Sequence, residues 1–160
     1  MLSIFHKLLN FYQEKVKKTP KEVNENPKKS KIYALERLKE CHNYDYATFV
    51  SKFLKKQNYI VWEYSKERNL IDHKINLVLK KDNDILLVQC KNNYSSISTN
   101  DIKLFEETVQ EFILEYKMFK NYNIILYYIF PEYQFDEVAS TYVASCKNID
   151  FKILKEHTDL

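Results

Sequence analysis

Apolar residues recur at helical spacing at the start of the chain and then give way to a polar segment. Residues 1–18 predict an amphipathic helix, whose apolar positions are Met1, Phe5, Leu8, Leu9, Tyr12 and Val16. Residues 19–31 hold two prolines and little that is apolar, which indicates a basic linker. We expect the helix to dock on its own domain, or to join a homo-oligomer or a partner protein. Contact with an anionic membrane surface is the remaining alternative.

The helical pattern returns after the linker and is followed by three strand patterns. Leu35, Leu38 and Cys41 predict one helix, and a stripe from Tyr46 to Leu54 predicts another. We expect Asn58 to end the second helix, as a glycine often does. The strands predicted next cover 59–64, 74–80 and 85–91. The residues Asp82-Asn83-Asp84 predict a tight hairpin between the last two strands.

The second half of the chain predicts helix, strand, helix and strand. Ser98 offers a helix cap, and the apolar stripe that follows predicts a helix to about Lys120. Residues 123–130 form a near-continuous apolar run, which is typical of a strand covered on both faces. A further helical stripe runs from Phe135 to Cys146, and a short strand is predicted over 149–154.

The order of these elements predicts an α/β protein. The predicted core reads α-βββ-α-β-α-β, and the long helix after the third strand allows a parallel fourth strand. We therefore expect a mixed central sheet with helices on both faces. The segments 1–18 and 19–31 would precede one domain over 32–156.

Composition narrows the possible functions. The chain has no glycine, which excludes the glycine-rich loops that cradle phosphates, and it leaves tight turns to Asn and Asp. The first 31 residues carry eight lysines and three glutamates, whereas the rest carries 17 Lys and Arg against 19 Asp and Glu. The body is thus not broadly basic, and it would bind a polyanion only through a local patch. No transmembrane segment or signal peptide is predicted, and three scattered cysteines suit a reducing cytoplasm.

The stretch ILLVQCKN, residues 85–92, holds the candidate chemistry. Side chains alternate across a strand, so Gln89 and Lys91 share one face while Cys90 lies on the other. We expect the amide and the ammonium to emerge together at the end of the strand, in a cleft that also receives Asn76 or Asp72. The plainer alternative is that both are ordinary solvent-facing residues.

This order of elements and this motif resemble the restriction-endonuclease-like nucleases, and the Gln-Cys-Lys version resembles their Mrr-type branch. Leu87-Val88-Gln89-Cys90-Lys91 matches that branch in full, and Ile75-Asn76-Leu77-Val78 aligns with its Ile-Asp-Leu-Ile. The resemblance covers about residues 33–154. It implies double-stranded DNA as substrate and Mg²⁺-dependent phosphodiester hydrolysis. Asp72, Asn76 and Gln89 would then hold the metal, and Lys91 would serve the attacking water.

The chain departs from the family pattern at its acidic positions. Asn76 stands where the family has aspartate, and Ala47 stands at the helix glutamate position. Hard cations are held mostly by carboxylates, so these neutral residues weaken the predicted site. Asp72 could reach it through a longer hairpin, with Glu36, Glu63 or Glu67 as a second carboxylate. The alternative is a catalytically inactive nuclease-fold module that binds DNA or a partner protein.

A group of basic residues is the candidate DNA-binding patch. They are Lys52, Lys55, Lys56, Lys66 and Arg68. They could contact phosphates beside the site, although a charged helix exterior explains them equally well.

Overall fold

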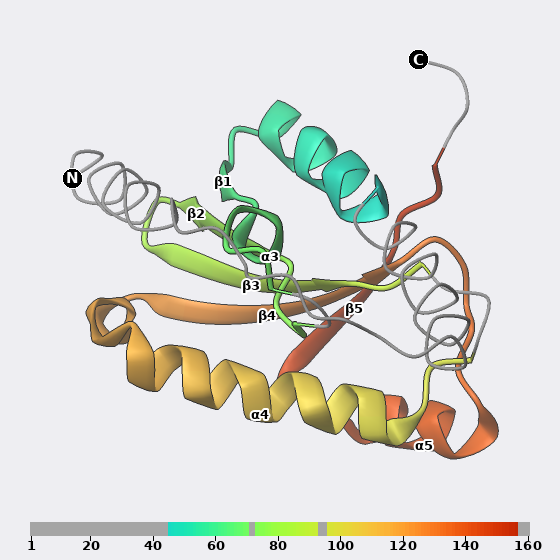
Figure 1. The fold of residues 1–160 in the computed structure, drawn as a ribbon. Coiled ribbons are helices and arrows are strands. Elements are labelled where there is room, and N and C mark those ends of the chain that lie inside the picture. The colour runs from blue at the N-terminus through green and yellow to red at the C-terminus, as the bar shows by residue number, and fades with distance from the viewer. Residues whose placement is uncertain (1–44, 71–72, 93–95, 157–160) are drawn as a thin grey trace, which may run out of the picture.

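The computed structural model describes residues 45–70, 73–92 and 96–156 (Figure 1). The predicted helices at 1–18 and 33–41 and the linker at 19–31 lie outside these ranges. Asp72 and Glu36 lie outside them as well.

A five-stranded mixed sheet forms the centre of the described domain. Its strands are β1 (Ile60–Trp62), β2 (Leu77–Lys81), β3 (Asp84–Cys90), β4 (Asn123–Phe130) and β5 (Ile149–Ile153). They lie side by side in chain order. The pairs β1–β2 and β2–β3 are antiparallel, whereas β3–β4 and β4–β5 are parallel. The mixed sheet and the parallel fourth strand are therefore as predicted.

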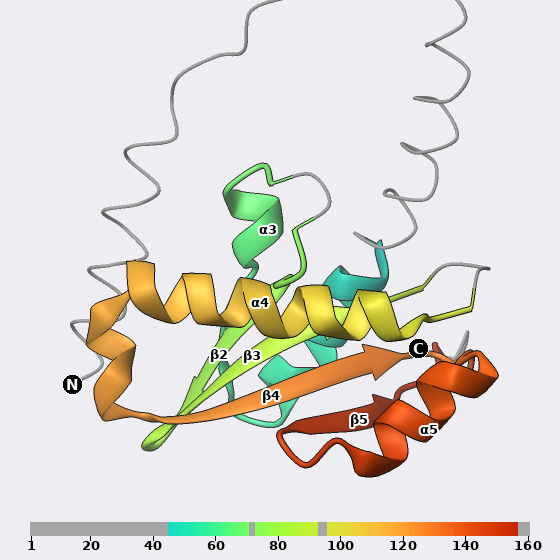
Figure 2. The same ribbon diagram turned by 90° about the horizontal axis from the view of Figure 1, so that it is seen from below.

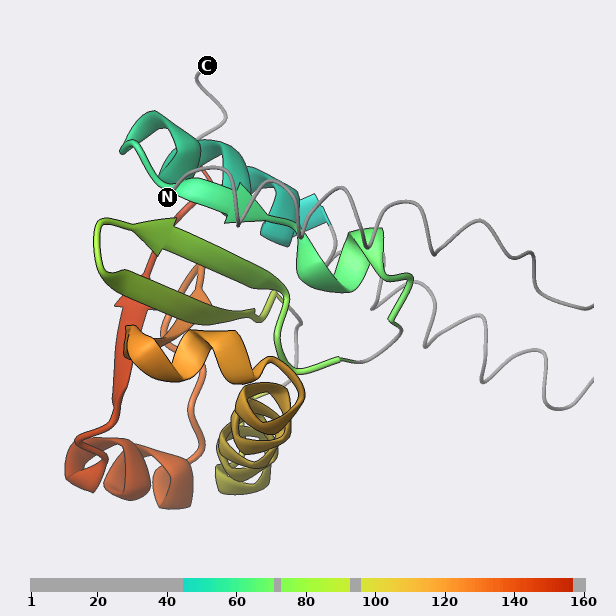
Figure 3. The ribbon, with the colours of Figure 1, turned by 90° about the vertical axis from the view of Figure 1, so that its left-hand side faces the viewer.

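Helices cover both faces of this sheet (Figures 1 and 3). A helix of residues 45–56 lies on one face. The other face is covered by α4 (Thr99–Glu115), the 3₁₀ helix η1 (Lys117–Asn121) and α5 (Glu137–Ser145). Figure 2 shows α4 crossing this face with α5 beside it, next to β5. A short helix, α3 (Tyr64–Glu67), follows β1.

The alternation of side chains along β3 separates two hydrophobic cores. Leu86, Val88 and Cys90 pack under the helix of residues 45–56. Ile85 and Leu87 pack into the larger core under α4. The sequence rule of period two thus held for the strand that carries the candidate chemistry.

Asparagine and aspartate take the backbone conformations that glycine usually takes. Asn58, Asn69 and Asp82 have positive φ angles of 65°, 51° and 51°. Asn58 follows the helix that it was predicted to end, and Asp82 lies in the predicted hairpin. Short polar side chains tolerate this region better than other residues do, which lets a chain without glycine make these turns.

Two features of the fold differ from the sequence prediction. The helix expected to reach Lys120 ends at Glu115, because Tyr116 leaves helical geometry with φ −102° and ψ 63° and η1 follows. The Tyr116 ring stacks on Phe112 at a centroid distance of 4.5 Å, so aromatic packing continues across the break. The helix α3 was not predicted, because four residues are too few to show a helical period.

Candidate functional site

Asn76 joins three elements through its amide. Its side chain is buried, and its Oδ1 accepts a hydrogen bond of 2.7 Å from the backbone N–H of Cys90 at the end of β3. Its Nδ2 donates to Ser65 Oγ in α3 at 3.4 Å. The oxygen that would ligate a metal ion is therefore already bonded to the backbone.

A narrow hollow opens beside Asn76, on the face covered by the helix of residues 45–56. Its lining residues are Ala47, Thr48, Glu63, Ser65, Lys66, Asn76 and Leu77. Ala47 and Asn76 are the two positions where the family pattern expects carboxylates, and they meet in this hollow.

Glu63 supplies the carboxylate of this hollow, and three donors already hold it. Ser51 Oγ lies 2.8 Å and Lys55 Nζ 3.1 Å from its Oε1, and Lys66 Nζ lies 3.4 Å from its Oε2. Burial alone would raise the pKa of Glu63. The Ser51 and Lys55 hydrogen bonds and the two ammonium charges outweigh burial and lower that pKa below its ordinary value. Glu63 is therefore charged and paired at neutral pH.

Gln89 lies on the opposite face of the sheet from this hollow. It is 5% exposed and is the register partner of Tyr128, whose ring belongs to the core under α4. Among the described residues, none donates a hydrogen bond to Gln89 Oε1. A buried oxygen without a donor is costly, which makes this an unusual position in the described core.

Lys91 lies on the same side as Gln89 and forms an ion pair. Its Nζ is 2.9 Å from Asp101 Oδ1, and the two side chains are 12% and 24% exposed. The other oxygen of Asp101 accepts from the N–H and the hydroxyl of Ser98, which completes a capping box at the start of α4. Burial would raise the pKa of Asp101, but Lys91 and Ser98 bind the carboxylate and lower it overall.

The sequence predicted that Asn76 would meet Gln89 and Lys91 in one cleft. The structure does not bring these side chains together. Strict alternation from Val78 would put Asn76 on the α4 face with Gln89. Ile75 and Val78 both pack into the α4-side core, so alternation breaks between them. The Asn76 side chain instead lines the hollow on the other face with Leu77.

The described residues do not fit a Mg²⁺ site of the expected kind. Within residues 45–70, 73–92 and 96–156, no three His, Cys, Asp or Glu side chains cluster as metal ligands would. In the hollow, the Asn76 oxygen and both Glu63 oxygens are engaged, and Lys66 adds positive charge. Mg²⁺ prefers unengaged carboxylates and water at close to octahedral geometry.

The candidate basic residues divide into three settings. Lys55 and Lys66 bind Glu63. Arg68 extends towards Glu115 at the end of α4, with 4.0 Å between the charged groups. Lys52 and Lys56 are exposed on the outer face of the helix, and no described residue pairs with either. They lie one turn apart and are the two candidates whose charge is available to a ligand.

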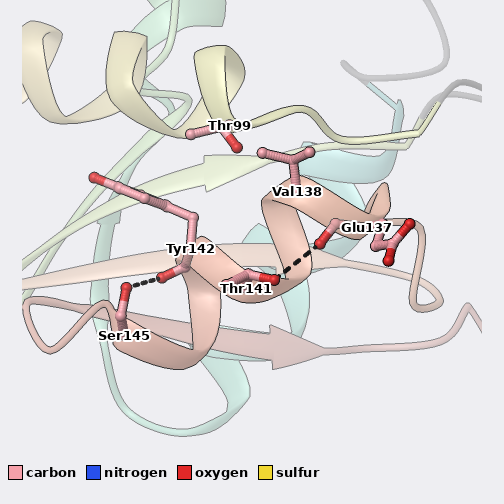
Figure 4. A pocket seen from close by; sticks show the side chains of 6 residues that line it. All are labelled: Thr99, Glu137, Val138, Thr141, Tyr142 and Ser145. Carbon is pink, nitrogen blue, oxygen red and sulfur yellow. Dashed lines mark hydrogen bonds between the residues drawn. The ribbon is translucent and has the colours of Figure 1, made fainter.

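A second hollow lies between the start of α4 and α5 (Figure 4). Thr99 lines it from α4, and α5 contributes the rest, including Val138, Thr141 and Ser145. The hydroxyls of Thr141 and Ser145 donate to carbonyls of their own helix. These groups are thus used within the helix and form no catalytic arrangement.

Sequence reasoning left three participating residues without a role. Ser65 and Ser51 gave no signal, because their importance comes from the hollow that α3 and the first described helix enclose. Asp101, by contrast, did give a signal in the sequence. Ser98 followed by an acidic residue three positions later is the pattern of a capping box, and Lys91 is close enough in sequence to reach it.

The order of the described elements, the mixed sheet and the Gln-x-Lys strand define an α/β domain of the restriction-endonuclease-like class. A family model, Mrr_cat, described as restriction endonuclease, matches residues 38–151. The chain therefore belongs to the Mrr-type restriction endonuclease family. No curated protein and no solved structure gave a match. In the described part of the chain, no helix is both long and apolar enough to cross a bilayer.

Proposed function

We propose that this chain is a nuclease-fold module that binds double-stranded DNA without cutting it. The observation that carries the proposal is the hollow shared by Ala47 and Asn76. Glu63 is the one acidic residue among its described lining residues, and Lys55 and Lys66 neutralise it. Hydrolysis of a phosphodiester by this family's chemistry needs a metal held by acidic oxygens, and this hollow offers none unpaired.

The DNA-binding half of the proposal rests on the family and on two lysines. The family acts on DNA, and Lys52 and Lys56 are exposed on the helix that borders the hollow, where no described residue pairs with them. Ammonium groups on an exposed helix face contact phosphates without reading sequence. Binding should therefore be insensitive to sequence and should weaken as salt rises.

A mobility-shift titration with a duplex of random sequence at low salt tests this function. We expect Lys52→Ala/Lys56→Ala to bind several-fold more weakly than the unaltered protein, because two phosphate contacts are lost. The matched control is Lys117→Ala/Lys120→Ala, which removes the same charge from η1 on the other side of the sheet. No shift by the unaltered protein, or equal losses in the two variants, would refute the proposed binding face.

A second candidate function is Mg²⁺-dependent cleavage of DNA, and Gln89 is the observation that favours it. Its buried Oε1 has no donor among the described residues, which leaves this oxygen available as a metal ligand. Asp72, outside the described ranges, would have to supply a carboxylate. Nicking of supercoiled plasmid in Mg²⁺ or Mn²⁺ by the unaltered protein, abolished by Lys91→Ala, would establish this activity. Equal traces from both proteins would exclude it.

A further inference from the structure

The hollow beside Asn76 contains a cation that belongs to the chain. Lys66 lines it, and its Nζ lies 3.4 Å from Glu63 Oε2 and 3.3 Å from Thr48 Oγ1. Glu63 is the N-cap residue of α3, the helix that carries Lys66, whereas Thr48 lies in the helix of residues 45–56. The Lys66 side chain is 55% exposed. The Lys66 ammonium thus pairs with the acidic lining group of the hollow and contacts the helix of residues 45–56, and a bound cation would contact the same oxygens.

The charges around Lys66 are consistent with this role. Two ammonium groups face the single carboxylate of Glu63, so the immediate charge of the cluster is +1. The other polar lining groups are neutral, namely Thr48, Ser65 and Asn76. A divalent cation entering this cluster would meet net repulsion, whereas a site with two free carboxylates would attract it.

The hollow is also small. It has no room for a free water molecule. With Lys66 lining it, the hollow leaves no room for a hydrated cation, because Mg²⁺ keeps several of its waters in most protein sites. Ala47 contributes only a methyl group here and leaves no oxygen in reach of a cation.

We propose that the ammonium of Lys66 takes the place of the divalent cation in this nuclease fold. The inference rests on the proposal that the fold does not cleave DNA, and it names the group that makes the hollow independent of metal. Lys66 then holds Glu63 and the helix of residues 45–56 in place without an ion from solution. Asn76 contributes by remaining neutral while it binds the Cys90 N–H.

The test measures Mn²⁺ binding to the full chain, with free Mn²⁺ followed by its electron paramagnetic resonance signal. We expect no saturable binding by the unaltered protein. Asn76→Asp/Lys66→Met, which supplies a carboxylate and removes the ammonium, should gain one saturable site. The matched control Asn76→Asp/Lys56→Met makes the same change in net charge but leaves Lys66, and we expect it to bind at least about tenfold more weakly.

Two results would overturn the proposal. One is saturable Mn²⁺ binding by the unaltered protein that Glu63→Gln abolishes, and the other is equal binding by the two double variants. If circular dichroism shows that Met at position 66 prevents folding, Asn76→Asp/Lys66→Gln repeats the comparison with a polar side chain. The mobility-shift titration is run without metal, so loss of DNA binding refutes the proposed function and leaves the metal comparison standing.

Discussion

At the scale of single residues, Asn76 explains how a family position can change its chemistry and keep the fold. Its Oδ1 accepts from the Cys90 N–H where backbone pairing between β2 and β3 ends. An aspartate could accept the same hydrogen bond, so the Asn side chain retains the structural contact and loses only the charge. The substitution that weakens a metal site is thus nearly isosteric.

This contact predicts a difference between two substitutions at position 76. Asn76→Ala should lower the free energy of unfolding by about 1–3 kcal/mol, because a buried N–H loses its acceptor. Asn76→Asp should lower it less, because the acceptor remains. Urea denaturation of both variants measures the difference, and an alanine variant as stable as the unaltered protein would contradict the role given to Asn76.

At the scale of elements, the helix of residues 45–56 depends on its buried face. Val50 is 0% exposed and packs against the sheet, whereas Val138 in α5 is 71% exposed. Both are valines on helices, so an alanine substitution changes helix propensity in the same way at each site.

We therefore expect Val50→Ala to cost about 2 kcal/mol of unfolding free energy, from two buried carbon groups and the space they leave. The control Val138→Ala should change that free energy by less than about 0.5 kcal/mol. Thermal or urea unfolding compares the two. Equal effects would mean that the helix does not pack on the sheet as described.

The cap of α4 predicts a pH dependence. The folded pKa of Asp101 lies below its ordinary value of 3.8, because Lys91 and Ser98 stabilise the charged form more than burial opposes it. A lowered folded pKa gives stability that is present above the unfolded pKa and is lost as pH falls through the folded one.

Asp101→Asn should consequently be less stable than the unaltered protein at pH 7, and the gap should narrow as pH falls below about 4. Urea denaturation at a series of pH values checks this. The variant Asp150→Asn, on an exposed carboxylate of β5, serves as the comparison. A difference in unfolding free energy that stays constant down to pH 3 would mean that the charge of Asp101 does not stabilise the fold.

At the scale of the whole molecule, charge is divided unevenly along the chain. Residues 1–31 carry eight lysines and three glutamates, whereas the remainder is slightly acidic. The family match begins only at residue 38, after this basic segment. Under the proposed DNA binding, this basic segment adds long-range attraction to the contacts of Lys52 and Lys56 in the domain.

Removal of residues 1–31 should leave the far-ultraviolet circular dichroism of the domain intact. It should also weaken DNA binding and reduce the salt dependence of that binding, because fewer ammonium groups displace counterions. Mobility shifts at two or more salt concentrations measure the slope. An unchanged slope would place all phosphate contacts in the domain itself, and an unfolded product would show that the segment is needed for the fold.

Much of this architecture followed from local rules. Strand alternation placed Cys90 and Leu87 on opposite faces of β3, each facing a different core. The tolerance of Asn58 and Asp82 for positive φ angles located two turns. These results depend on backbone geometry and neighbouring residues, which the sequence states directly. The short helix α3 escaped prediction because four residues show no helical period, and the break at Tyr116 escaped it because the aromatic stripe continues from Phe112 to Tyr116 across the break.

The sequence by itself determined the family and the element order, because periodicity and residue identity are local properties. The tertiary structure decided which groups meet. The break in alternation between Ile75 and Val78 turned Asn76 away from Gln89, and the packing of α3 brought Lys66 to Thr48 in the helix of residues 45–56. Lys91 met Asp101 because α4 begins beside the end of β3. A cluster of charges forms only when distant elements pack, so its balance could not be derived from spacing along the chain.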